Sequence, residues 1–325
     1  MNLDELIQRF LDDRAAYCAD RTVEFYTVNL GKFREYLASG GIDLVEDLDY
    51  ETAQRYQTHI RKYIGRTGRK IKNTSVNTYM RAVRTFLRWL TDEGYLKQTV
   101  KLPKKVRDDS DQIIPLTASE VEVLDNLILR DYYFRESPAL WSYYTRRNWL
   151  LLHSMLDEGL RVAEVAALRW SQVDFDKGLL LVYKGKGRKD RIVPLSAVYG
   201  EQLRYYRDEI LAPGHRHPES YVFYDRFEGE PITVNAIKLY MSKKKRQSGI
   251  DRLHCHLLRH TFATSFIMGG GDVSVLRVLL GHEDFVITQR YLHLAAQFTI
   301  AKTDIYKLDS VYRDRFTLKP VIKDI

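Results

Sequence analysis

Four residues that can act on a phosphate lie close together near the end of the chain. His256 and Arg259 are three positions apart, where a segment with apolar residues at helical spacing begins. Residues three apart share a helix face, so both side chains can point at one spot beside a helix N-terminus, which itself favours an anion. His282 and Tyr291 follow, and both histidines could reach the phenol. We interpret this stretch as the chemical centre and its target as a phosphate.

Three short helices are expected to position these groups. Each is bounded by glycines or by capping residues. The first spans about 257–268 and ends at the glycines 269–271; the second runs from Asp272 to Gly281, directly before His282; the third is capped by Glu283 and Asp284 and carries Tyr291.

The order of these residues resembles the tyrosine recombinase (phage integrase) family. The pattern H-x-x-R-H, then L-G-H, then a tyrosine one short helix later is present, and two further family motifs lie upstream. They are Gly159-Leu160-Arg161-Val162-Ala163-Glu164 and Gly185-Lys186-Gly187-Arg188-Lys189-Asp190-Arg191-Ile192-Val193-Pro194-Leu195. Four motifs in the right order make a specific match over residues 116–294 and a looser one before them.

The resemblance implies a DNA strand-transfer enzyme that works through a 3′-phosphotyrosyl intermediate. A tyrosine has a free pKa of ~10 and needs a base and positive charge to attack at neutral pH. We expect Tyr291 to be the nucleophile and His256 its base. Arg161 and Arg259 are expected to pair with the non-bridging phosphate oxygens, with His282 as a further donor.

Lys186 is expected to protonate the departing 5′ oxygen from the tip of a hairpin. Lys189 is the competitor, and the alignment with the family motif favours Lys186. Glu164 is expected to orient its helix and its partners, whereas His260 and His293 are interpreted as packing or surface residues. No cofactor is expected, because the covalent link retains the free energy of the phosphodiester.

Composition favours a soluble globular protein, with 45% hydrophobic and 29% charged residues. No apolar run approaches the ~18–20 residues of a bilayer span, and the start lacks the layout of a signal peptide. We therefore expect a cytoplasmic, DNA-associated protein without membrane contact. Cys18 and Cys255 are too few for a disulfide framework. The triplet 254–256 cannot easily surround one tetrahedral ion, so no metal is expected.

A chain of 325 residues predicts two domains. Residues 1–100 should hold four helices, at about 3–17, 22–38, 50–63 and 73–93, and resemble the family's core-binding domain. Residues 101–115, with Pro103 and a polar run, should be the linker. The catalytic domain, 116–294, should open with a capping box and contain β-structure over 173–195. The expected fold is mainly α with a small β-sheet, a four-helix domain plus an α+β catalytic domain, and the resemblance implies a C-shaped DNA clamp.

Basic residues point to a polyanionic partner. Lysine and arginine number 51 against 43 acids, a net charge of +8. Arg81, Arg84 and Arg88 form a stripe on one helix face that suits DNA phosphates. A solvated surface is the alternative reading for any single basic run. The other candidate DNA-binding residues are Lys70, Lys72, Lys104, Lys105, Lys243, Lys244, Lys245 and Arg246.

Two segments allow more than one interpretation. Residues 130–147, rich in tyrosine and charge with a break at Ser137-Pro138, could be an elaborated surface loop, an extra helix, or a contact to DNA or a neighbouring protomer. His153, Ser154 and Asp157 are not expected to form a hydrolase triad, because neighbours in one helix cannot adopt the relay geometry.

The tail, 295–325, is too short for a domain of its own. The resemblance implies that it docks onto the next protomer of a tetramer on two paired recombination sites in double-stranded DNA. A helix folded back on its own domain is an equal alternative.

The predicted function is site-specific recombination of a mobile element or of a replicon-resolution system. A catalytically silent accessory protein or repressor and a type IB topoisomerase are the alternatives. The full set of catalytic types argues against the first, and an N-terminal module suited to a short defined site argues against the second. Integration, excision, resolution and inversion share this chemistry and stay open.

Overall fold

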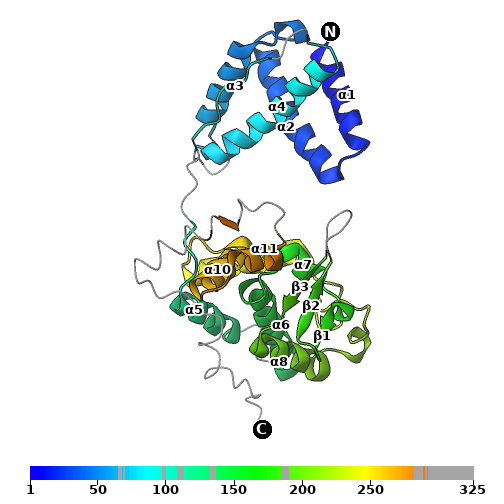
Figure 1. The fold of residues 1–325 in the computed structure, drawn as a ribbon, viewed down its shortest axis with the longest axis vertical. Coiled ribbons are helices and arrows are strands. Elements are labelled where there is room, and N and C mark those ends of the chain that lie inside the picture. The colour runs from blue at the N-terminus through cyan, green and yellow to red at the C-terminus, as the bar shows by residue number, and fades with distance from the viewer. Residues whose placement is uncertain are drawn as a thin grey trace. The chain divides into compact units, whose positions relative to one another are not determined.

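The chain divides into two compact units, residues 1–112 and 113–325, each with its own hydrophobic core (Figure 1). The computed structural model describes residues 1–64, 68, 70–96, 100–107, 113–131, 137–183, 190–281, 288, 289 and 291. In this part of the chain, no helix is both long enough and apolar enough to cross a membrane.

Four helices form the first unit, as the sequence predicts. They are α1 (Leu3–Ala15), α2 (Asp20–Ser39), α3 (Tyr50–Lys62) and α4 (Asn73–Asp92). The side chains of Asn2 and Asp49 cap α1 and α3 by accepting from backbone N–H groups. Apolar residues of α4 spaced by three and four pack against the other three helices, and aromatic rings of α1 and α4 meet edge to face.

The segment 100–107 lies against the first unit. Asn77 Nδ2 donates to the carbonyl of Val106 at 2.8 Å, and Asn77 Oδ1 accepts from the N–H of Val106 at 3.0 Å. Leu102 and Val106 pack on the core of the unit. The first half of the predicted linker, residues 101–115, therefore packs on the first unit, whose helices partly bury Leu102 and Val106.

Helix α6 (Pro138–Leu156) is the central element of the second unit (Figure 1). Every residue from Thr145 to Leu156 is buried, as expected for a helix covered on all sides. The interpretation of residues 130–147 as a surface elaboration is wrong for their second half. Pro138, a favoured first residue, starts a continuous helix, and Arg147 donates from Nη1 to the carbonyl of Tyr224 at 2.9 Å.

Shorter helices surround α6. Thr117 and Glu120 form the predicted capping box at the start of α5. The bounds are α5 (Ala118–Leu129), α7 (Val162–Ala166), α8 (Ala197–Tyr205), which continues as a π-helical turn over Tyr206–Ile210, α9 (Val234–Ser248), α10 (Cys255–Met268) and α11 (Val273–Leu280).

The predicted small β-sheet is present beside these helices. Strands β1 (Val173–Asp174), β2 (Leu179–Val182) and β3 (Arg191–Pro194) are antiparallel in the order β1-β2-β3. Leu180 pairs with Val173 on one side and with Val193 on the other. Lys186 and Lys189 lie between β2 and β3 in the sequence, outside the described residues.

The basic run on α9 is not a continuous surface patch. Lys244 is fully buried, and its Nζ lies 2.7 Å from Asp131 Oδ2 and donates to the carbonyl of Leu127 at 2.9 Å. Lys243 binds the other oxygen of Asp131 at 2.9 Å. The prediction that Lys244 binds DNA is therefore wrong, because the helix turns this residue into the core toward a carboxylate.

A buried charged cluster lies at the C-terminal end of α6. His153 binds Asp157 through Nδ1 at 2.7 Å and Asp125 through Nε2 at 3.0 Å. Burial alone would lower the pKa of His153, but the charges and hydrogen bonds of the two aspartates raise it to about 9. Ser154 donates to the carbonyl of Leu150 at 2.7 Å, which agrees with the expectation that these neighbours form no hydrolase relay.

The stability of the second unit should fall as the pH rises from about 6.5 to about 9. Folded His153 keeps a proton that the unfolded chain, with a pKa of 6.5, releases, so its contribution is complete below pH 6.5 and lost as pH reaches about 9. Burial raises the pKa of Glu158 to about 8, which acts in the same direction. The loss attributable to His153 is roughly 3 kcal/mol.

Urea unfolding followed by tryptophan fluorescence measures this change, since Trp149 stacks on His153 with ring centroids 4.0 Å apart. The substitution His153→Gln should make the pH dependence shallower. His217→Gln, in an exposed loop, is the matched control. An unchanged slope in His153→Gln would contradict the assignment.

Candidate active site

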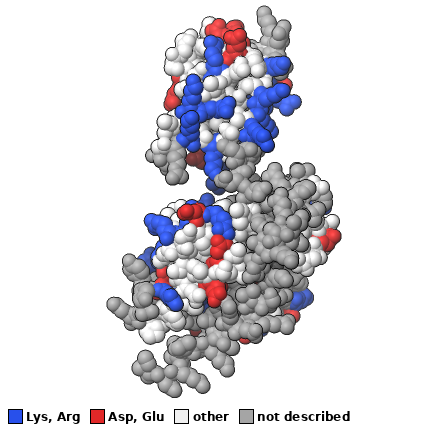
Figure 2. Space-filling model, turned by 90° about the vertical axis from the view of Figure 1, so that its left-hand side faces the viewer, with Lys and Arg blue, Asp and Glu red and all other residues white. Residues whose placement is uncertain are grey.

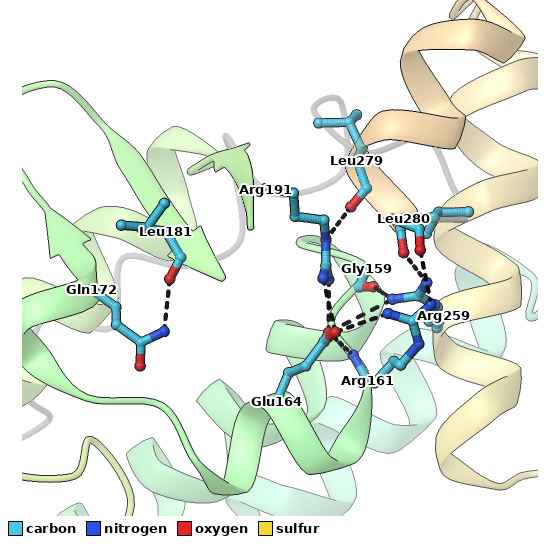
Figure 3. Close-up of polar contacts among 10 residues, drawn as sticks. Gly159, Arg161, Glu164, Gln172, Leu181, Arg191, Arg259, Leu279 and Leu280 are labelled. Atoms are coloured by element: carbon cyan, nitrogen blue, oxygen red, sulfur yellow. Dashed lines mark hydrogen bonds and ion pairs between the residues drawn. The ribbon is translucent and has the colours of Figure 1, made fainter. Parts of the chain in front are cut away.

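The carboxylate of Glu164 binds three arginines (Figure 3). Arg161, just before α7, donates to it from the backbone N at 2.7 Å and from Nη1 at 2.9 Å. Arg191 on β3 binds both oxygens, at 2.8 and 2.7 Å. Arg259 on α10 lies 3.8 Å away. Burial alone would raise the pKa of Glu164, but Arg191 and then Arg161 lower it to about 2, so the carboxylate is ionised.

The same three arginines also bind the end of α11. Three successive carbonyls each accept from one guanidinium: that of Leu279 from Arg191 Nε at 2.6 Å, that of Leu280 from Arg259 Nη2 at 2.5 Å, and that of Gly281 from Arg161 Nη2 at 3.4 Å. The last carbonyls of a helix have no partner within it and carry partial negative charge, so they suit cations. The arrangement fixes guanidiniums from α10, β3 and the start of α7 around one point.

Only glycine suits position 159, for two reasons. Its φ of +63° lies in the left-handed region, and an added Cβ would come within 2.5 Å of the Phe262 ring. This close approach lets its carbonyl accept from Arg259 Nη1 at 2.6 Å. The glycine of the G-L-R motif therefore positions the arginine of the H-x-x-R motif.

The three arginines around Glu164 differ in exposure. The side chain of Arg161 is 34% exposed, whereas those of Arg259 and Arg191 are 5% and 3% exposed. His256, also exposed, is the second residue of α10. Desolvation lowers the pKa of His256, and the charges of Arg259 and Arg161 lower it further. The neutral ring therefore lies in the positive field of the two predicted clamp arginines.

Tyr291 is buried, with 4% of its surface exposed. Its ring packs with residues of α10 and α11, and its hydroxyl lies 2.7 Å from Nδ1 of His260. Burial and the neighbouring His256 lower the pKa of His260 to about 4, so the ring is neutral at pH 7. With the proton on Nε2, the phenol donates to Nδ1. His260, interpreted from the sequence as a packing or surface residue, therefore lies within hydrogen-bond distance of the predicted nucleophile.

The structure brings together most of the predicted site residues that it describes. Arg161, Glu164 and Arg259 are in direct contact, with His256 and Tyr291 beside them. Lys186, His282 and His293 lie outside the described residues. Two contacts were not predicted from the sequence, that of Arg191 with Glu164 and that of His260 with Tyr291. His260 follows His256 by four positions and so shares its helix face, which was an available signal.

The candidate DNA-binding residues of the first unit are on its surface. Arg81 and Arg88 on α4 are exposed, as are Lys70, Lys72, Lys104 and Lys105, and Arg84 is partly exposed. Basic side chains predominate over acidic ones on the face of this unit seen in Figure 2. The guanidinium of Arg81 lies 4.8 Å from the Phe25 ring centroid, and this cation–π contact helps to hold the side chain in place. In the second unit Lys245 is partly exposed and Arg246 is exposed.

One cavity borders this site, and another lies in the first unit. One of about 250 Å³ lies in the first unit, lined by Lys32 and by aromatic residues such as Tyr36 and Tyr79, and it contains no motif residue. Another, of about 160 Å³, borders Glu164. Among the described residues, no three His, Cys, Asp or Glu side chains are arranged to hold a metal ion.

Comparison with known proteins agrees with this arrangement. Residues 133–297 match the phage integrase family, and residues 2–105 match the phage integrase SAM-like domain. The tyrosine recombinase XerD of Ralstonia nicotianae is 30% identical over 300 residues, covering 90% of this chain and 91% of the relative. The tyrosine recombinase XerC of Pediococcus pentosaceus is 27% identical over 321 residues, 97% of this chain and 98% of the relative.

Solved structures share the fold at lower identity. The Tn1549 transposon integrase in complex with a circular intermediate DNA has a TM-score of 0.70 at 14% identity, over 93% of this chain and 99% of that one. A lambda integrase dimer bound to a COC′ core site has a TM-score of 0.66 at 18% identity, over 90% and 95%. The four motifs, the arginines gathered on Glu164 and these matches lead to one conclusion: the chain belongs to the phage integrase family of tyrosine recombinases, which are DNA breaking-rejoining enzymes.

Proposed function

We propose that this protein is a site-specific DNA recombinase that cuts and rejoins strands through a 3′-phosphotyrosyl intermediate. Tyr291 Oη attacks the phosphorus of one backbone linkage, the bond to the 5′ oxygen breaks, and that oxygen leaves as a hydroxyl after receiving a proton. The 5′ hydroxyl of a partner strand then attacks the phosphotyrosine and releases the phenol. Each step exchanges one ester bond for another, so the sequence of reactions balances without an external energy source.

The observation that carries this proposal is the fixed arginine pair beside a tyrosine. Arg161 and Arg259 are held by Glu164, by the carbonyl of Gly159 and by the end of α11, so they need little rearrangement to receive a phosphate. Two guanidiniums can neutralise the charge that gathers on the non-bridging oxygens in the transition state. The 34% exposure of Arg161 supports its role as the first contact with DNA.

His260 is the better candidate for the base that accepts the phenolic proton. Its Nδ1 lies 2.7 Å from the hydroxyl, which is within the reach that a general base requires. We assign the exposed His256 to the phosphate instead, where a ring N–H can donate to a non-bridging oxygen. His282 is proposed as a further donor, and Lys186 as the acid for the 5′ oxygen.

The proposed partner is double-stranded DNA with paired recombination sites, reached in the cytoplasm. The relatives named XerC and XerD support a role in recombination at defined sites, and the transposon integrase structures suggest a mobile element as an alternative context. The exposed basic residues of α4 suit the phosphate backbone. We propose that protomers assemble as a tetramer on two sites, with residues 295–325 exchanged between neighbours.

A nicked suicide substrate tests the central step. The duplex carries the recognition site identified by footprinting, with a nick just downstream of the scissile phosphate. Cleavage then releases a short fragment with the new 5′ hydroxyl, which diffuses away, so that the covalent complex accumulates. The protein should form an adduct that denaturing electrophoresis detects, and Tyr291→Phe should form none while still binding DNA. Tyr183→Phe, an exposed tyrosine next to β2, is the matched control. No adduct with the unaltered protein would refute the proposed function.

The pH dependence of cleavage tests the base. Because His260, with a pKa of about 4, accepts a proton only when neutral, the single-turnover rate should change little between pH 8 and 6 and fall as the pH approaches 4. His260→Asn keeps an acceptor near Nδ1 without basicity and should slow cleavage about 10²–10⁴-fold. His217→Gln should have no effect. A midpoint near 6.5, or a normal rate in His260→Asn, would assign the role to another group.

A substrate with sulfur in place of the 5′ bridging oxygen tests the acid. A thiolate leaves without receiving a proton, so the variant lacking the acid should recover on this substrate. Lys186→Ala should cleave ordinary DNA about 10²–10⁴-fold more slowly and approach the normal rate on the sulfur substrate. Lys189→Ala should resemble the unaltered protein on both. Recovery confined to Lys189→Ala would reverse the assignment.

A further inference from the structure

Arg191 is the least exposed of the three arginines around Glu164. As the first residue of β3, it points its side chain toward α7 and the end of α11 (Figure 3). All three of its guanidinium nitrogens make hydrogen bonds, Nη1 and Nη2 to Glu164 and Nε to the carbonyl of Leu279. With 3% of the side chain exposed, it has neither the surface nor a spare nitrogen with which to bind a phosphate.

Arg191 is the main ion-pair partner of Glu164. Its two contacts, at 2.7 and 2.8 Å, match carboxylate geometry on both oxygens, whereas Arg259 stays 3.8 Å away. One carboxylate and three guanidiniums leave a local net charge of +2, and without Arg191 it would be +1. The freed carboxylate oxygens would then draw Arg161 and Arg259 inward, because a buried carboxylate seeks full pairing.

Arg191 also joins three parts of the site. Its strand is one arm of the hairpin that carries Lys186, Glu164 lies in the helix that follows Arg161, and Leu279 lies two residues before Gly281. A single side chain therefore sets the distance between the hairpin, the helix after the first arginine and the end of α11. Rigid support of this kind holds reacting groups in their productive geometry.

We propose that Arg191 is a positioning residue for strand cleavage, which keeps Arg161 and Arg259 available to the phosphate by holding the charge of Glu164. The inference rests on the proposed cleavage reaction and concerns a residue that does not touch the DNA. It separates the arginines by function: two act on the phosphate, and the third supports them.

Replacement of one charged phosphate oxygen tests this role. The experiment compares single-turnover strand cleavage, at saturating protein, on the nicked duplex with either a phosphate or a neutral methylphosphonate at the scissile position. The variants are Arg191→Met, which removes the charge, and Arg191→Lys, which keeps the charge without the paired geometry. Arg207→Met is the matched control, because this arginine is partly exposed in the π-helical turn and outside the cluster.

We expect Arg191→Met to cleave the phosphate substrate about 10²-fold more slowly and Arg191→Lys about 10-fold more slowly, with DNA affinity within about threefold of normal. On the methylphosphonate, which needs less charge from the clamp, both should come within about threefold of the unaltered protein. Arg207→Met should be normal on both substrates.

Two results would overturn the inference. Equal losses on both substrates would mean that Arg191 has only a structural role, and a normal rate of Arg191→Lys and Arg191→Met on the phosphate would mean that it has none. Arg191→Lys decides the question by itself if Arg191→Met does not fold. Failure of the unaltered protein to cleave either substrate would instead count against the proposed function.

Discussion

The site depends on one carboxylate that is shared among three positive charges. Guanidiniums brought this close repel one another, and Glu164 with the carbonyls at the end of α11 supplies the negative charge that offsets the repulsion. The arginines lower the pKa of Glu164 to about 2 and so keep it ionised, and the ionised carboxylate in turn holds the arginines together. Several elements meet at this carboxylate, since α7, α10, α11 and β3 each contribute a donor or an acceptor.

Helices with clear capping residues could be predicted in both units because such signals are local. Asp272 and Gly281 define the ends of α11, and Thr117 with Glu120 defines the start of α5, without reference to any distant residue. The motif residues Arg161 and Arg259 were predicted from the resemblance. The contact that organises them was not, because Arg191 meets Glu164 only once the strand and the helix have packed together.

Charge runs were the least reliable guide. Four consecutive basic residues suggest a solvated surface, yet Lys244 shares a face with Ile237 and Met241, and all three are buried. The helical spacing of these three residues indicates that Lys244 faces the core, but the run of like charges suggested a surface instead. The segment after residue 100 shows the same limit, because a proline and mixed charge suggested a linker although apolar residues nearby pack against the first unit.

The burial of Tyr291 means that the proposed nucleophile must leave its packing before it can react. Its ring packs among Phe262, Leu276 and Leu280, and withdrawing such a side chain from its neighbours costs on the order of 2 kcal/mol. A phenol that leaves this packing to meet a phosphate is then available in only about one molecule in thirty, unless bound DNA stabilises the released form. Under the proposed chemistry, an encounter with the wrong DNA sequence is unproductive because Tyr291 stays buried. Discrimination between sites would then come from a shift in the population of the released form as well as from recognition of the bases.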